Sequence, residues 1–298
     1  MRIAVTGSNG FIGSALVRAL ESRGDRVVRL VRSGVQAEDR VLWDPERGTL
    51  DAEALSSVDA AINLAGEPIG KRRWSARQKA RILDSRERGT TLLSQTLARL
   101  SPHPRVLLSA SAMGYYGDRG DQLLTEEDAS GEGFLASVCR RWEAATAAAS
   151  DAGIRVAHVR TGLPLDPSGG LMKRILLPFR LGLGGRLGSG RQWMSWVSLS
   201  DQIGAMLHLL DDDEARGAFN IAAPNPTRNS EFTHVLAHVL RRPAVIPLPK
   251  ALIAIPFGRE LTDDLLTSIR ISPARLERSG YRFRAPELEP ALRAMLGR

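Results

Sequence analysis

The chain has 298 residues, 43% of them hydrophobic and 25% charged, and it contains one cysteine, Cys139. These values are typical of a soluble globular protein with one large or two closely packed domains, and a single cysteine excludes an internal disulfide or a cysteine-based zinc cluster. The net charge of +8 comes from arginines spread along the chain without a nucleic-acid-binding motif, so we expect no nucleic-acid partner.

The first elements of the chain read as a buried strand, a glycine-rich turn and a helix. An apolar run over Met1–Thr6 leads into Gly7-x-x-Gly10-x-x-Gly13, a helical pattern follows, and a second strand covers Arg26–Val31. Gly7 permits the sharp turn, Gly10 lets a pyrophosphate approach the backbone, and Gly13 lets the helix pack on the strand. The alternative is a tight turn without a ligand. We predict that a dinucleotide binds here and contacts Gly7, Ser8, Asn9, Gly10, Phe11, Ile12 and Gly13.

The end of the second strand indicates which dinucleotide binds. NAD-binding units usually place an acidic residue there, which accepts a hydrogen bond from the free ribose hydroxyl, whereas this chain has Arg32 and Ser33. A guanidinium binds a 2′-phosphate in a bidentate fork, so Arg32, with help from Ser33 or Arg29, favours NADP(H) over NAD(H). Alternatively, Arg32 is an ordinary surface arginine in an arginine-rich chain.

Strand and helix patterns continue to alternate along the first half of the chain. Apolar strands are expected over Val58–Ala65, Arg105–Ser109 and Ile154–Arg160, with helices around Ile82 and over Phe134–Ala149. Repeated units of this kind predict an α/β fold of the Rossmann type, in which helices cover both faces of a doubly wound parallel sheet.

The glycine content rises after residue 161, which indicates a second lobe. We expect an NADP-binding Rossmann domain over residues 1–165, with a returning segment near 196–222, and a smaller C-terminal substrate lobe over 166–298. Because ligands of such folds bind beyond the carboxyl ends of the strands, further cofactor contacts are predicted near those ends. The expected residues are Leu64, Ala65, Gly66, Arg86, Ser109 and Thr161. We also expect Asp201 to cap a helix over residues 202–210.

Several motifs together resemble a known family. Thr6-Gly7-x-x-Gly10-x-x-Gly13, Asn63-Leu-Ala-Gly66, the run from Ser109 to Gly117 and Arg160-Thr-Gly162 resemble an extended short-chain dehydrogenase/reductase of the NAD-dependent epimerase/dehydratase type. Other segments resemble its atypical YfcH/SDR39U1 subgroup, which carries a C-terminal domain of unknown function, DUF1731, here at about residues 245–298. These segments include Trp43-Asp-Pro45, Gln192-Trp-Met-Ser-Trp196 and the tail from Ile271 to Phe283. The resemblance implies a small-molecule substrate, such as a sugar nucleotide or carbonyl compound, and a homodimer is one possible assembly.

The helix over residues 134–143 departs from that family's catalytic pattern. The family transfers protons with a tyrosine and with a lysine four residues later, which lowers the pKa of the phenol. Counting back from Glu143 places Leu135 and Cys139 at these two positions. The standard route for proton transfer is therefore absent.

Two candidates remain for this proton transfer, Tyr116 and Ser111. Ser111 lies next to Ala112, which occupies the position of the family's catalytic serine or threonine, and Tyr116 follows the same strand. The alternative for Tyr116 is packing with a hydrogen-bonded hydroxyl. We expect Tyr115 to pack or to contact the substrate.

A loop that starts at Gly188 lies where related enzymes contact their substrates. Its residues Arg191, Gln192 and Trp193 offer an anion fork, an amide and an aromatic face, which suit a polar small molecule. The alternative is a structural loop that its tryptophans hold in place.

Two functions remain open. The first is an NADP-dependent oxidoreductase or nucleotide-sugar epimerase-like enzyme, and the second is a catalytically inactive NADP-binding sensor or interaction protein. His234 and His238 lie four residues apart but lack the intervening glutamate of a metalloprotease, so we expect no metal. No run resembles a secretory leader or a membrane span, so we expect a cytoplasmic protein without a membrane partner.

Overall fold

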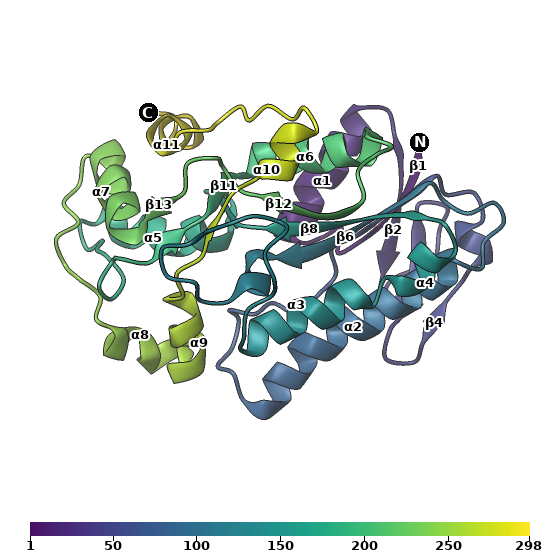
Figure 1. The fold of residues 1–298 in the computed structure, drawn as a ribbon, viewed down its shortest axis with the longest axis horizontal. Helices are drawn as coiled ribbons and strands as arrows, with labels where there is room; N and C mark the ends of the chain where they lie inside the picture. Colours follow the sequence, from purple (N-terminus) through teal and green to yellow (C-terminus); the bar gives the residue numbers. More distant parts are fainter.

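An eight-stranded sheet lies at the centre of the computed structural model, which describes residues 1–298 (Figure 1). The strand order is β12-β8-β6-β5-β1-β2-β3-β4, and every neighbouring pair is parallel except β3 and β4. The strands are β1 (Arg2–Thr6), β2 (Arg26–Val31), β3 (Arg40–Asp44), β4 (Thr49–Leu50), β5 (Ala60–Asn63), β6 (Val106–Ala112), β8 (Arg155–Thr161) and β12 (Gly217–Ile221). This arrangement confirms the predicted Rossmann-type sheet.

Helices cover both faces of the sheet. Figure 1 shows α1 (Phe11–Ser22) and α6 (Leu199–Asp211) on one face, and α2 (Ala76–Leu97), α3 (Phe134–Ala144) and α4 (Ala147–Asp151) on the other. Successive side chains of a strand point to opposite faces, so Ile3 and Val5 pack in the core beneath α1 and α6 while Ala4 packs in the core beneath α2. Burial on both faces explains why the strands read as continuous apolar runs.

The predicted helix over residues 134–149 is divided into α3 and α4. The division falls at Thr146, whose hydroxyl donates a 2.8 Å hydrogen bond to the carbonyl of Glu143. This side-chain bond offers the backbone an alternative to the helical hydrogen bond. The sequence patterns also did not predict β3 and β4, which extend the sheet beyond β2.

Short strand pairs and helices form the rest of the chain. The pairs are β9 (Leu163–Asp166) with β11 (Trp196–Ser198), β10 (Trp193–Met194) with β13 (Thr227–Arg228), and β7 (Leu123–Leu124) with β14 (Arg270–Ile271). The helices are α5 (Gly170–Arg180), α7 (Asn229–Leu240), α8 (Lys250–Phe257), α9 (Arg259–Leu265), α10 (Ala274–Arg278) and α11 (Leu288–Leu296), and two single turns are η1 (Glu53–Leu55) and η2 (Met113–Tyr116). A separate apolar core lies among α5, α7 and α11, whereas β11, α6 and β12 lead the chain back to the central sheet beside β8.

Asp201 links this C-terminal part to the part that contains the central sheet. The sequence predicted that Asp201 caps α6, and this prediction is wrong. The cap is Ser198, whose Oγ accepts a 2.9 Å hydrogen bond from the Asp201 N–H. The fully buried Asp201 carboxylate accepts hydrogen bonds from the Tyr281 hydroxyl at 3.0 Å and from the backbone N–H groups of Arg284 and Ala285 at 2.8 and 3.0 Å. The aspartate therefore anchors the C-terminal tail on α6.

None of the helices combines the length and the apolar character that crossing a membrane would require.

Candidate functional site

The glycine-rich turn connects β1 to α1 and leaves backbone donors open. Gly10 is the N-cap of α1 with an extended backbone, and no side chain caps the helix. The N–H groups of the first helical turn therefore have no acceptor within the helix. Gly7 has φ +66°, and a Cβ there would lie 2.7 Å from the Leu64 carbonyl, while a Cβ on Gly13 would lie 2.1 Å from the Gly7 oxygen. These contacts require glycine at both positions and place the helix N-terminus directly beyond the end of β1.

A buried polar network holds the end of β5 against this turn. Thr6 Oγ1 accepts hydrogen bonds from the N–H groups of Leu64 at 3.0 Å and Ala65 at 3.1 Å, and donates to Asn63 Oδ1 at 2.7 Å. Asn63 Nδ2 in turn donates to Thr90 Oγ1 at 2.8 Å and to Ser109 Oγ at 3.3 Å. Leu64 and Ala65 therefore lie beside the glycine turn, as the sequence predicts.

Ser109, expected to contact the cofactor, has no exposed surface. Its hydroxyl accepts the hydrogen bond from Asn63 and so belongs to the polar network. In this structure Ser109 therefore supports the end of β5 and does not face a cofactor directly. The sequence motifs contain Thr6 and Asn63 but assign neither a role in the site, and they do not include Thr90. The polar residue that ends each of β1 and β5, within otherwise apolar strands, is the signal that could have found the first two.

Arg32 and Ser33 lie exposed just beyond β2. The Arg32 guanidinium has no hydrogen bond or ion pair within the protein, whereas that of Arg29 pairs with Glu21 and, at 3.2 Å, with Asp39. Arg32 is therefore free to meet an anionic ligand, and Arg29 is not.

Arg86 of α2 places a guanidinium beneath the loop that follows β5. A Cβ on Gly66 would lie 2.9 Å from the guanidinium carbon. Arg86 Nη1 donates to the carbonyls of Glu67 at 2.9 Å and Ile82 at 3.1 Å, and the group lies 4.9 Å from the centre of the Trp142 ring. Burial lowers the pKa of Arg86, although the nearby Glu67 acts in the opposite direction. The structure therefore places the Arg86 guanidinium, an expected cofactor contact, next to Gly66.

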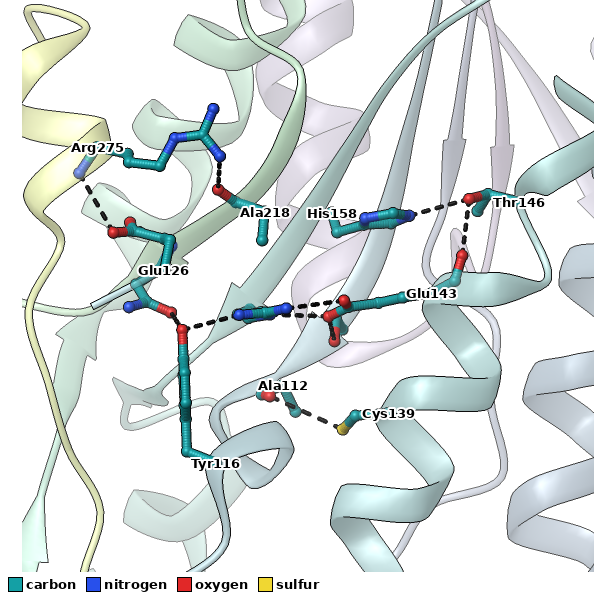
Figure 2. A network of polar contacts seen from close by, with 12 residues as sticks. Ala112, Tyr116, Glu126, Cys139, Glu143, Thr146, His158, Ala218 and Arg275 are labelled. Atoms are coloured by element: carbon teal, nitrogen blue, oxygen red, sulfur yellow. Dashed lines mark hydrogen bonds and ion pairs between the residues drawn. The ribbon is translucent and has the colours of Figure 1, made fainter. Parts of the chain in front are cut away.

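A second polar network occupies the ends of β6 and β8 (Figure 2). Arg160 donates from Nε to Glu143 Oε1 and from Nη2 to Glu143 Oε2, both at 2.9 Å, and from Nη1 to the Tyr116 hydroxyl at 3.0 Å. Ser111 Oγ donates to Glu143 Oε1 at 2.6 Å, and the Tyr116 hydroxyl donates to Asn220 Oδ1 at 2.8 Å. Nearly every polar atom of this cluster therefore has a partner inside the protein.

The network explains the direction of two pKa shifts. Burial raises the pKa of Tyr116 to about 12, although Arg160 acts in the opposite direction. Burial by itself would raise the pKa of Glu143 as well, but the hydrogen bonds and charge of Arg160 and the bond from Ser111 hold it below its ordinary value. At neutral pH the cluster therefore contains a neutral phenol and a salt-bridged carboxylate.

The burial of Tyr116 and Ser111 argues against the predicted role of either in proton transfer. Tyr116 is 0% exposed and Ser111 is 3% exposed, so neither hydroxyl has a direct route to a substrate in this conformation. Tyr115 differs, because its ring lies half-exposed on the Arg160 guanidinium, 3.4 Å from the ring centre, and its hydroxyl has no partner in the protein. Of the two neighbouring tyrosines, Tyr115 is the one able to touch a ligand.

The positions of the family's missing pair lie next to this network on α3. The Leu135 side chain lies 3.2 Å from where a Cβ of Gly114 would be, and Cys139 Sγ lies 4.0 Å from it. Burial raises the pKa of Cys139 to about 11, so its thiol stays protonated near neutral pH. Neither residue supplies a proton carrier or a charge.

Thr161, at the end of β8, is half-buried and accepts a 3.3 Å hydrogen bond from Gln202 Nε2. The Oε1 atom of Gln202 is buried without a partner. Gln202 Oε1 is therefore an unpaired hydrogen-bond acceptor close to Thr161, which the sequence predicts to contact the cofactor.

The three candidate residues in the loop after Gly188, which are Arg191, Gln192 and Trp193, have different surroundings. Gln192 is buried with its amide bonded to the Leu187 carbonyl at 3.1 Å, and Trp193 Nε1 donates to Asp121 Oδ1 at 2.8 Å. Arg191 is exposed and, with Gln192, borders a cavity of about 320 Å³. Gln192 and Trp193 therefore stabilise the loop, and Arg191 has the freer side chain.

No group of three or more histidine, cysteine, aspartate or glutamate side chains is arranged to hold a metal ion.

Comparisons with known proteins agree with this geometry. Residues 3–222 match the family described as "NAD dependent epimerase/dehydratase family", and residues 248–295 match "Domain of unknown function (DUF1731)". The "Epimerase family protein Mb2239" of Mycobacterium bovis is 40% identical over 290 residues, which are 97% of this chain and 96% of that protein. The human epimerase family protein SDR39U1 is 36% identical over 299 residues, covering 99% of this chain and all of the relative. These matches confirm the resemblance predicted from the motifs.

Two solved structures extend the comparison to the fold. The crystal structure of human SDR39U1 (isoform 2) with NADPH superposes with a TM-score of 0.92 at 35% identity and covers 100% of this chain and 99% of that one. A nucleoside-diphosphate sugar epimerase from Corynebacterium glutamicum superposes with a TM-score of 0.83 at 35% identity. The match covers 100% of this chain and 58% of the epimerase chain.

Proposed function

The chain belongs to the NAD dependent epimerase/dehydratase family, and we propose that it is an NADP(H)-dependent oxidoreductase or epimerase-like enzyme acting on a polar small molecule. The observation that carries this proposal is the open glycine turn. The first turn of α1 presents N–H groups without side-chain caps, and Gly10 has no side chain to cover them. A helix N-terminus of this kind binds a pyrophosphate.

The surrounding residues fit an NADP(H) molecule. The turn from Gly7 to Gly13 would hold the pyrophosphate, and the unpaired Arg32 with Ser33 would hold the 2′-phosphate. Leu64 and Ala65, fixed by Thr6, would border the adenine and ribose side of the cleft. The NADPH in human SDR39U1 supports the same cofactor for this chain.

When bound, the nicotinamide would donate or accept a hydride, and the chain would orient it and handle the proton. Arg86 supplies a fixed positive charge beneath Gly66, which would favour negative charge that develops on a substrate oxygen. We assign substrate contact and proton transfer to Tyr115, because its hydroxyl is unpartnered and the Arg160 guanidinium lies over its ring. Tyr116 and Ser111 then act as positioning residues, since both bond to the Arg160–Glu143 pair.

The cavity near Arg191 supports a proposal for the substrate class. Its lining also includes Ser189, Arg228 and Asp121. Because Arg228 pairs with Asp121 at 3.0 Å, the Arg191 guanidinium is the cation that the cavity offers to a phosphate or carboxylate. A sugar nucleotide carries such groups, and the description of the Corynebacterium glutamicum relative as a nucleoside-diphosphate sugar epimerase supports this class. A smaller carbonyl compound is the other substrate class to test.

Calorimetric titration of NADPH, NADP⁺, NADH and NAD⁺ tests the cofactor first. We expect the two phosphorylated forms to bind and the others to bind more weakly. NADPH oxidation by aldehydes, ketones and quinones, and NMR analysis of sugar nucleotides incubated with cofactor, then test the reaction, with Tyr115→Phe as the diagnostic variant. Tight NADPH binding without any turnover would instead indicate an inactive NADP-binding sensor or interaction protein, and absence of NADPH binding would overturn the proposal itself.

A further inference from the structure

A separate cavity lies in the C-terminal lobe, away from the glycine turn. Its volume is about 760 Å³, and it lies between α7, the chain that follows α7, the loop before β10, and α11. Figure 1 shows α7 and α11 at the end of the molecule remote from β1 and β2. The residues of the proposed nucleotide site do not contribute to its lining.

One face of α7 forms a wall of this cavity. Ser230, Thr233, His234, Ala237 and His238 line it, at spacings of three and four residues that place them on the same side of the helix. The opposite side of α7 packs in the apolar core with α5 and α11. The two histidines, which matched no metal motif in the sequence, therefore face a common cavity.

Arginines converge on this cavity from three separate segments. Arg241 and Arg242 follow α7, Arg186 comes from the loop before β10, and Arg293 comes from α11. No aspartate or glutamate lines the cavity, and one acidic residue, Glu289, pairs with Arg293 at 2.7 Å and lies 3.7 Å from His238.

Three of these guanidinium groups have no carboxylate partner. Arg186 donates to the Ser189 carbonyl at 2.7 Å, Arg242 donates to the Arg180 carbonyl at 3.0 Å, and Arg241 makes no side-chain hydrogen bond. Like charges gathered around one cavity repel one another, and a bound anion removes that cost. The C-terminal dipole of α7 attracts the cations at its own end, but it does not account for Arg186 and Arg293, which other segments contribute.

We propose that this cavity is a second ligand site, which binds a multiply charged anionic small molecule such as a polyphosphate or a polycarboxylate. Planar guanidinium groups form bidentate hydrogen bonds with both kinds of anion, and the cavity volume is in the range of small-molecule sites. The Ser230 and Thr233 hydroxyls add neutral donors along the same wall. This site is independent of the proposed nucleotide function.

Calorimetric titration with inorganic tripolyphosphate, and separately with citrate, tests the proposal. The titrations use the full chain carrying Gly10→Val, so that binding to the glycine turn does not interfere. We expect saturable binding and a loss of affinity of about tenfold or more in Arg241→Gln/Arg242→Gln. The difference between tripolyphosphate and citrate identifies which anion the cavity prefers.

A matched control separates a built site from general attraction by a basic protein. Arg99→Gln/Arg282→Gln removes the same charge from two exposed arginines that do not line the cavity, and its affinity should stay within about twofold of that of the parent. An Arg186→Gln variant, altered in a different segment, should also weaken binding. Equal losses in the two double variants, or no saturable binding of either anion, would overturn the proposal.

Discussion

Two regions at the same edge of the central sheet treat their polar groups in opposite ways. At the ends of β1 and β2, the N–H groups of α1 and the Arg32 guanidinium have no partners in the protein. At the ends of β6 and β8, Arg160, Glu143 and Tyr116 bond to one another and are almost wholly buried. The first region is open to a ligand, whereas the second is closed on itself.

The difference indicates which part of the family's chemistry this chain retains. Unpaired donors next to a glycine turn are costly unless a ligand or water meets them, so they point to a binding function. A satisfied buried network holds neighbouring groups in place, and here the group held is the ring of Tyr115. The nucleotide side is therefore that of the family, whereas Leu135 and Cys139 stand at the positions of the family's tyrosine and lysine.

The largest effect should come from breaking the closed network. Arg160→Ala leaves the Glu143 carboxylate buried without its cation and should lower the free energy of unfolding by about 3–5 kcal/mol. Urea denaturation measures this change. Arg141→Ala is the matched control, because its 2.6 Å pair with Glu87 is largely exposed and should contribute about 0–1 kcal/mol. Similar losses in the two variants would show that the network does not behave as a buried ion pair.

The open region should respond in binding and not in stability. Gly10→Val should weaken NADPH binding about 100-fold or more, because the side chain would occupy the space of the pyrophosphate. The fold should tolerate it, since the φ of Gly10 is −76° and a Cβ there meets only the Gly7 oxygen, at 3.1 Å. Gly13→Val should instead lower the free energy of unfolding, because a Cβ at residue 13 would lie 2.1 Å from the Gly7 oxygen. Calorimetric titration and urea denaturation of both variants separate the two effects, and unchanged NADPH affinity in Gly10→Val would contradict the assignment.

A smaller effect is expected for cofactor choice. Arg32→Gln should weaken NADPH binding by about 10- to 100-fold and leave NADH binding unchanged, since only the 2′-phosphate contact is lost. Arg29→Gln serves as the control, because the Arg29 guanidinium already pairs with Glu21 and Asp39. If the two variants lose the same NADPH affinity, general charge and not a specific contact explains the preference.

The sequence predicted the fold and the glycine turn because both depend on local patterns. Apolar runs separated by helical periods identify a parallel sheet, and three glycines at fixed spacing identify the turn after β1. The pairing of Glu143 with Arg160 was not predictable, because the two residues come from α3 and β8 and meet only in the folded chain. The burial of Tyr116 was not predictable either, because its partners Arg160 and Asn220 are distant in the sequence.

Removal of single hydroxyls should distinguish the two tyrosines more finely. Tyr116→Phe leaves Asn220 Oδ1 without its donor and should cost about 1–3 kcal/mol of unfolding free energy. Tyr115→Phe should leave stability nearly unchanged, because the Tyr115 hydroxyl has no partner in the protein. Any NADPH turnover should fall about 10²- to 10⁴-fold in Tyr115→Phe and change much less in Tyr116→Phe. The reverse order of activities would return Tyr116 to the role that the sequence first indicated.

The smallest effect is a dependence of stability on acid. The pKa of Glu143 is lower in the folded protein than its ordinary value, so the stabilisation it gives is complete above the pKa of the unfolded chain and is lost as the pH falls through the folded-state pKa. One proton contributes a slope of at most about 1.4 kcal/mol per pH unit in that window. The difference in unfolding free energy between wild type and Glu143→Gln, measured by urea denaturation from neutral to acid pH, should therefore shrink as the pH falls. A difference that stays constant would mean that the Glu143 carboxylate is not held in its charged form by Arg160, and the closed region would then lack the electrostatic basis argued for it.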